Sequence, residues 1–282
     1  MERRSRAEFR ARTEQHAQQR GSDVARQIAV ISAVCFAIIA AVFGVGVAGG
    51  TPIRDVQGGS LDADATLLAP GSPAFSIWSV IYVGLIAYAV WQALPSQRTT
   101  LRQRTLGWWI AGTAVLNGLW LVAAQFGELW MTLAVIVLLL VALCATLRLT
   151  VTTAELRSPW LDVLLIDGVT GLHLGWVSLA TVANTAAFLS TVAPASWADG
   201  GTAAAIVVLV VVLAVGLTVS GVTQWRIAPP WAMGWGVLWI GVARLTGEPY
   251  SAPVGWVALV VAGILFVIPT VLRIGVALRS GD

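Results

Sequence analysis

The side chains in this sequence that could do acid–base chemistry are few and lie within apolar stretches. Asp167 and His173 pair a carboxyl with an imidazole in one such stretch, and together they could relay a proton or act as an acid and a base. They are six residues apart, which puts them at opposite edges of one helix face. An ion pair of Asp167 with Arg148 or Arg157 is favoured instead. An enzyme is therefore the function that the sequence favours least.

The sequence lacks the motifs of metal, nucleotide and nucleophilic chemistry. It has two histidines and two cysteines but no CxxC or HExxH spacing, which would indicate zinc. It also has no P-loop and no GxSxG. Cys35 and Cys144 fall within apolar stretches, where cysteine behaves as a small apolar residue. We expect no catalytic residue, no metal site and no required cofactor.

Aromatic and polar side chains recur on one face of three apolar stretches. At 100° per residue, each set below falls within a limited arc of a helix, about 100° for the first and about 140° for the third. The first set is Phe75, Trp78, Ser79 and Tyr82; the second is Trp109, Thr113, Asn117 and Trp120; the third is Asp167, Thr170, His173, Ser178, Thr181 and Asn184, flanked by Trp176.

Such faces on helices in lipid point toward other helices or a cavity, because a carboxylate at the bilayer centre costs about 2.5–3.5 kcal/mol. Aromatic rings beside oriented amides suit a flat aromatic ligand. The alternative is hydrogen bonding between helices. For Trp78 with Tyr82 and for Asn117 with Trp120 a pocket is favoured, whereas both interpretations remain open for the hydroxyl residues of the third set.

The composition indicates that helices in a membrane carry these faces. The chain of 282 residues is 57% hydrophobic and 11% charged, with a mean hydropathy of +0.82. Because backbone groups in hydrocarbon must be paired, we expect an all-α polytopic helical bundle with apolar runs of about 20 residues. About eight spans are predicted, at Gln27–Gly50, Ala74–Leu94, Leu106–Phe126, Leu129–Leu147, Leu161–Ser190, Ala203–Gln224, Pro230–Leu245 and Pro253–Ile274.

Two of these spans depart from an ordinary crossing. Pro230–Leu245 is short and follows Pro229, so it is either a full crossing or a re-entrant segment. Leu161–Ser190 is longer than a bilayer requires, so it must tilt or project. The stretch from Thr51 to Pro73, which connects the first and second spans, is long for a connection. It is either a lid over a site or a disordered surface loop.

The basic residues give an orientation. All 17 are arginines, and with eight spans only Arg54 and Arg244 fall on the side opposite the basic amino terminus. Since cytoplasmic loops are rich in arginine, we expect both termini in the cytoplasm of a bacterial cell. Residues 1–26 and 277–282 are then cytoplasmic tails. The first tail could bind anionic lipid, but its acidic residues favour a solvated tail.

Three motifs in these stretches resemble the tryptophan-rich sensory protein family (TspO/MBR), to which the translocator protein is related. PAFSIWSVIY (73–82) is similar to its Phe-x-x-x-Trp-x-x-Leu-Tyr signature, LNGLW (116–120) to Leu-Asn-x-x-Trp, and WVSLATVAN (176–184) to Trp-x-x-Phe-Ala-x-x-x-Asn. The resemblance covers 27–190. It implies a five-helix membrane domain there, followed by an additional three-helix segment, 203–276, without a counterpart.

The resemblance also implies a ligand pocket under the first loop. Relatives bind porphyrin, haem or other hydrophobic aromatic molecules in such a pocket. The sequence departs from the signatures in several places. Phe75 is one residue closer to Trp78 than usual, and Leu179 replaces the usual Phe. The proline-rich segment that usually precedes the Trp of the fifth span is missing, and His173 lies near where an aromatic residue is usual. His173 is either an axial ligand to haem iron or a packing residue. The predicted ligand-binding residues are Phe75, Trp78, Ser79, Tyr82, Asn117, Trp120, His173, Trp176, Ala180 and Asn184.

These features favour a membrane sensor or receptor for a hydrophobic or tetrapyrrole ligand. A small-molecule transporter is the alternative. A transporter is expected to carry polar groups near the membrane midplane in both halves of the chain, whereas here they cluster in the first five spans. A porphyrin- or lipid-modifying enzyme ranks third. The expected partners are the ligand, membrane lipid and a second copy in a homodimer, and no nucleic acid.

Overall fold

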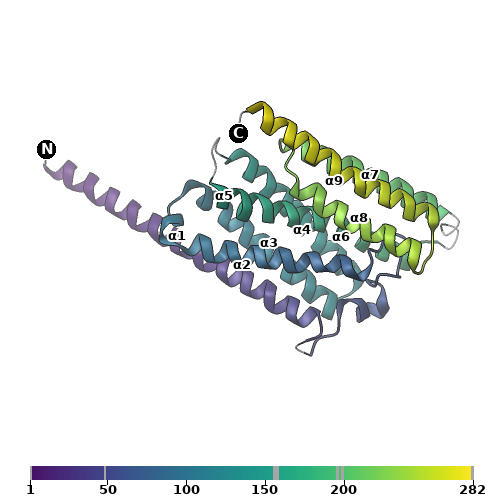
Figure 1. Cartoon of the computed structure of the whole chain (residues 1–282). Coiled ribbons are helices and arrows are strands. Elements are labelled where there is room, and N and C mark those ends of the chain that lie inside the picture. The colour runs from purple at the N-terminus through teal and green to yellow at the C-terminus, as the bar shows by residue number, and fades with distance from the viewer. Residues whose placement is uncertain (1, 48, 155–158, 195–196, 198–199, 281–282) are drawn as a thin grey trace.

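The chain folds into a bundle of long helices in the computed structural model, which describes all residues except 1, 48, 155–158, 195–196, 198–199 and 281–282 (Figure 1). The described residues contain no strand. The long helices are α1 (Glu2–Gly44), α2 (Ile77–Ala93), α3 (Leu101–Phe126), α4 (Leu129–Thr152), α6 (Val169–Val192), α7 (Gly201–Val222), α8 (Ala228–Thr246) and α9 (Ala252–Ser280). The shorter ones are η1 (Ile53–Gly59), η2 (Ser72–Ser76), η3 (Pro95–Gln97), α5 (Trp160–Asp162) and the π-helix η4 (Val163–Gly168).

The polytopic helical bundle predicted from the sequence is confirmed. Within the described residues, seven segments are long and apolar enough to cross a membrane. One of them, Trp160–Val192, joins α5, η4 and α6 into the long fifth span. The seventh predicted span, α8, is not among them by composition. It is nevertheless one unbroken helix of 19 residues, about 28 Å long, so it is not a pair of re-entrant half-helices.

The first helix differs most from its predicted bounds. Helix α1 begins at Glu2 rather than at Gln27, so the predicted tail is its continuation, and Asp23 and Arg26 are buried in the bundle. The helix ends at Gly44 rather than Gly50. Gly46 and Gly49 follow with φ of +82° and +90°, a conformation that glycine adopts without strain and that ends the helix.

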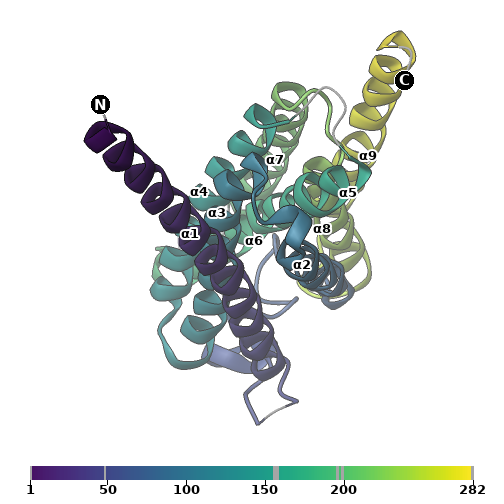
Figure 2. The ribbon, with the colours of Figure 1, turned by 90° about the vertical axis from the view of Figure 1, so that its left-hand side faces the viewer.

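Figures 1 and 2 show α1 on one side of the bundle and α9 on the other, with both termini at the same end. Helix α3 contacts α1 and α4, and α6 contacts α2, α4 and α8. Helix α8 in turn contacts α7 and α9. Helix α6 therefore lies between the first helices of the chain and the last three.

The last three helices share a core with the first five. Trp235 and Trp239 of α8 pack against the buried cluster built from α1, α2, α3 and α6. Leu179 of α6 in turn belongs to the cluster of α7, α8 and α9. Packing is thus continuous across the boundary predicted between 27–190 and 203–276.

Glycines allow this close contact of α6 with α8. A Cβ atom at Gly175 would overlap the carbonyl oxygen of Pro229, and one at Gly236 would overlap the side chain of Leu179. Small residues let helix backbones approach closely in membranes, where packing contributes much of the association energy. The two glycines therefore set the distance between the two helices.

Gly175→Ala is expected to lower the free energy of unfolding by about 1–3 kcal/mol, because backbone atoms of α8 must move away. The measurement is an SDS titration of detergent-purified protein. Gly263→Ala on α9 is the matched control, since nothing lies within 4 Å of a Cβ atom there. Equal unfolding curves for the two variants would contradict the close approach.

Candidate ligand-binding site

An aromatic cluster joins the start of α2 to α6. Trp78 stacks on Tyr82, with ring centroids 5.4 Å apart and planes 18° apart. The Trp78 ring also meets the edges of His173 at 5.8 Å and Trp176 at 6.1 Å. Phe75 of η2 meets Trp176 at 5.7 Å. The first and third predicted faces therefore point at each other.

Two amides tie the second face to the other two. The hydroxyl of Tyr82 donates to Oδ1 of Asn117 at 2.9 Å, which links α2 to α3. Trp120 Nε1 donates to Oδ1 of Asn184 at 3.3 Å, which links α3 to α6. Asn184 Nδ2 donates to the carbonyl of Ala180 one turn earlier, at 2.9 Å. The three predicted faces converge.

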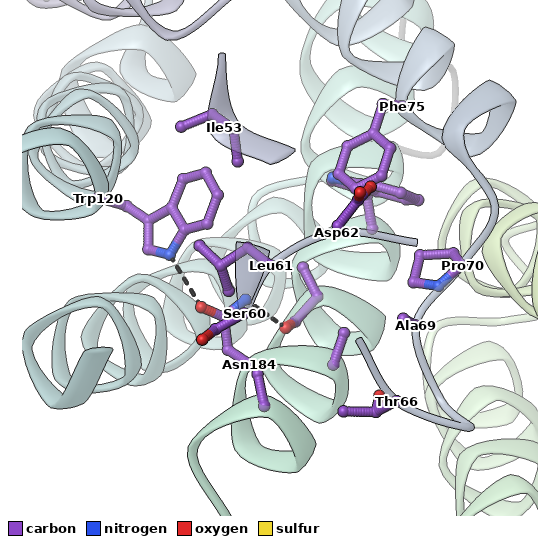
Figure 3. A pocket seen from close by; sticks show the side chains of 14 residues that line it. Ile53, Ser60, Leu61, Asp62, Thr66, Ala69, Pro70, Phe75, Trp120 and Asn184 are labelled. Carbon is purple, nitrogen blue, oxygen red and sulfur yellow. Dashed lines mark hydrogen bonds between the residues drawn. The ribbon is translucent and has the colours of Figure 1, made fainter. Parts of the chain in front are cut away.

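A pocket lies beside this convergence, between α3, α6 and the loop that contains η1 and η2 (Figure 3). The loop supplies one wall, and the helices supply aromatic rings, small alanines and the Asn184 amide. The lining residues are Ile53, Ser60, Leu61, Asp62, Thr66, Ala69, Pro70, Phe75, Trp120, Trp176, Ala180, Ala183, Asn184 and Ala187.

The pocket is nearly closed in this conformation. Its volume is about 40 Å³, room for a few water molecules, whereas sites for drug-sized ligands have about 300–1,000 Å³. Loop residues such as Leu61 and Thr66 form part of its wall. An occupant of tetrapyrrole size therefore requires the lining residues to move apart.

One wall of the pocket carries an unsatisfied donor. Trp176 is 1% exposed, and its Nε1–H has no hydrogen-bond partner among the described residues. An indole N–H can only donate, and buried donors are normally paired. A residue of the pocket wall thus has a donor available for an acceptor atom of an occupant.

Several predicted site residues lie elsewhere. Ser79 is exposed and does not line the pocket, and Trp109 is also exposed, at 43%. His173 is buried against Trp78 and is not part of the lining, which favours its packing role. Ser178 and Thr181 donate to carbonyls of their own helix, so they neither line the pocket nor join helices.

Asp167 forms an ion pair, but not with the predicted arginine. Its partners are Arg102 of α3 and Arg226 of the α7–α8 connection, the latter at 3.1 Å. Arg148 is exposed and not in this cluster, and Arg157 is outside the described residues. Arg102 also pairs with Asp162 at 3.1 Å. Asp162 immediately precedes the π-helix η4 and Asp167 lies within it, and both pair with Arg102.

The loop residues of the pocket were not identified in the sequence. Ile53, Leu61 and Thr66 line it from an irregular segment, where no periodicity indicates which side chains point inward. The only available signal was the length of the loop.

Comparison with protein families gave one match that covers nearly the whole chain. The family described as TSPO-like protein matches residues 28–271. The chain belongs to the TSPO-like family. No curated protein and no solved structure matched it. The match corrects the extent expected from the motifs, because it runs past residue 190 through α7 and α8 and into α9. The last three helices are therefore part of what the TSPO-like family shares.

Tyr82→Phe in this TSPO-like chain is expected to lower the free energy of unfolding by about 1–3 kcal/mol, because it leaves the buried Oδ1 of Asn117 unpaired. Asn117 Nδ2 already has no partner among the described residues. Ser79→Ala on the exposed side of α2 is the control and should be neutral. Thermal unfolding in detergent measures both, and a neutral Tyr82→Phe would show that the bond contributes no stability.

Proposed function

We propose that this TSPO-like membrane protein binds a hydrophobic aromatic ligand of the tetrapyrrole class, such as porphyrin or haem, in the pocket beneath the first loop. The observation that carries the proposal is the pocket wall, which contains the rings of Trp120 and Trp176 and the Asn184 amide held by Trp120. Flat rings stack on such side chains, and a few polar groups orient them.

The unpaired indole N–H of Trp176 supports a ligand with acceptor atoms. A porphyrin carries carboxylates on an otherwise apolar ring, and one acceptor could take this hydrogen bond. The small alanines of α6, Ala180, Ala183 and Ala187, would let a flat ring lie close to the helix. Binding is proposed to displace the loop, because the closed pocket has only about 40 Å³.

A sensor or receptor of the bacterial cytoplasmic membrane fits this site best. Both termini lie at one end of the bundle (Figure 1), and Arg102, at the start of α3, is joined through Asp167 to Arg226 of the α7–α8 connection. Arginine is enriched on the cytoplasmic side of membrane proteins. We therefore propose cytoplasmic termini and a pocket near the opposite face of the membrane.

The test is titration of detergent-purified protein with protoporphyrin IX and with haem, followed by the Soret band of the ligand. Wild type should bind saturably. Trp120→Leu removes a ring from the pocket, and Asn184→Leu removes the amide at similar volume. Each should raise Kd at least tenfold, which corresponds to about 1.4 kcal/mol.

Trp130→Phe is the matched control, because Trp130 is 52% exposed and outside the pocket. Its Kd should equal that of wild type. Non-saturable uptake, or equal affinity in all four proteins, would mean that the ligand partitions into the micelle or binds elsewhere, and the proposal would be rejected.

A further inference from the structure

The loop over the pocket is held from one side by an arginine of α8. Arg244 is 0% exposed, and its guanidinium donates to the carbonyls of Thr66 at 2.7 Å and Ala63 at 2.8 Å. A third bond, to the carbonyl of Glu248 at 3.1 Å, fixes the guanidinium to its own chain segment. Thr66 itself lines the pocket.

Two further bonds join the same loop to α8. Trp235 Nε1 donates to the carbonyl of Ala74 at 2.9 Å, and the backbone N–H of Gly71 donates to the carbonyl of Trp239 at 3.2 Å. The segment between Ala63 and Ala74 is therefore fixed along α8. It includes Ala69 and Pro70 of the pocket wall.

The other end of the loop is attached to α3. Gln57 donates to the carbonyls of Ala124 and Gly127, both at 3.3 Å, and Thr51 exchanges hydrogen bonds with Gln125. The loop thus bridges from α3 to α8 across the mouth of the pocket. Breaking the hydrogen bonds to α8 would release the segment that contributes Thr66, Ala69 and Pro70 to the pocket wall.

The Arg244 contact has the chemistry of a specific clamp. Among the described residues no carboxylate forms an ion pair with it, so carbonyl oxygens of the backbone are its partners. The planar fork of arginine can reach several carbonyls at once, which the single ammonium of lysine does less well. A buried cation is costly unless it is hydrogen-bonded, so the loop and Arg244 depend on each other.

We propose that Arg244 is a positioning residue that holds the loop closed over the pocket, so that the C-terminal helices set ligand access. This inference rests on the proposed function for the ligand, but the positioning of the loop can be tested without one. Helix α8 then controls a pocket that it does not itself line.

The first experiment is hydrogen–deuterium exchange of the ligand-free protein, read on peptides that cover residues 60–74. Arg244→Met removes all donors but keeps most of the apolar stem, and should speed exchange there at least tenfold. Arg244→Lys should fall between Met and wild type. Arg273→Gln is the control, because Arg273 is exposed and bonds only to the carbonyl of Gln224 at 3.4 Å near the other end of α9.

Exchange in residues 60–74 that is unchanged in Arg244→Met would overturn the inference. If Arg244→Met does not fold, Arg244→Lys and Trp235→Phe carry the test, since the latter removes the bond to Ala74 and keeps an aromatic ring against Trp239. Faster exchange confined to this loop, with α3 and α6 protected as in wild type, supports it.

The second experiment is stopped-flow binding of protoporphyrin IX. Association and dissociation should both accelerate at least tenfold in Arg244→Met and remain unchanged in Arg273→Gln. Wild-type rates in Arg244→Met despite faster loop exchange would show that the loop does not limit access. If wild type does not bind porphyrin, the proposed function fails, while the exchange result still decides whether Arg244 positions the loop.

Discussion

The bilayer interior offers no water, so each polar group within this bundle must find a partner inside the protein. This constraint accounts for the internal contacts of the structure. Asp167 is matched by Arg102 and Arg226. The amides of Asn117 and Asn184 accept from aromatic side chains of neighbouring helices. Some buried donors nevertheless have no partner among the described residues, and Trp176 Nε1 is one of them that belongs to a residue of the pocket wall.

Helical periodicity predicted which helix faces turn toward one another, although Trp78, Tyr82 and Asn117 of these faces do not line the pocket. Trp78, Tyr82, Asn117, Trp120 and Asn184 converge because one face of a helix in lipid must turn toward the protein. Periodicity could not separate residues at the edge of a face. Ser79 is on the predicted arc of α2 but at its exposed border, and only the position of the neighbouring helices decides that.

Two other features could not be derived from spacing. The partners of Asp167 depend on which helices are neighbours, and Arg102 and Arg226 are far from it in sequence. The loop has no regular repeat, so its inward-facing residues followed no pattern. Its turns depend on partners supplied by α3 and α8, such as the Arg244 guanidinium that binds the carbonyl of Thr66.

Two departures from the tryptophan-rich signature on the fifth span fall where α8 packs, whereas His173 packs against Trp78 of α2. Leu179, which replaces the usual Phe, fits against Gly236 of α8, where a larger ring would meet the helix backbone. The residues that precede Trp176 include Gly171 and Gly175 rather than prolines. Pro229 of α8 packs against both glycines, where a Cβ atom would overlap it. The third signature is thus altered on the side facing α8, while Trp176 and Asn184 keep their places at the pocket. The family match also spans α8, so α6 and α8 form one packing unit within it: small residues of each helix lie where the other approaches, and α8 also bonds to the loop beside the pocket.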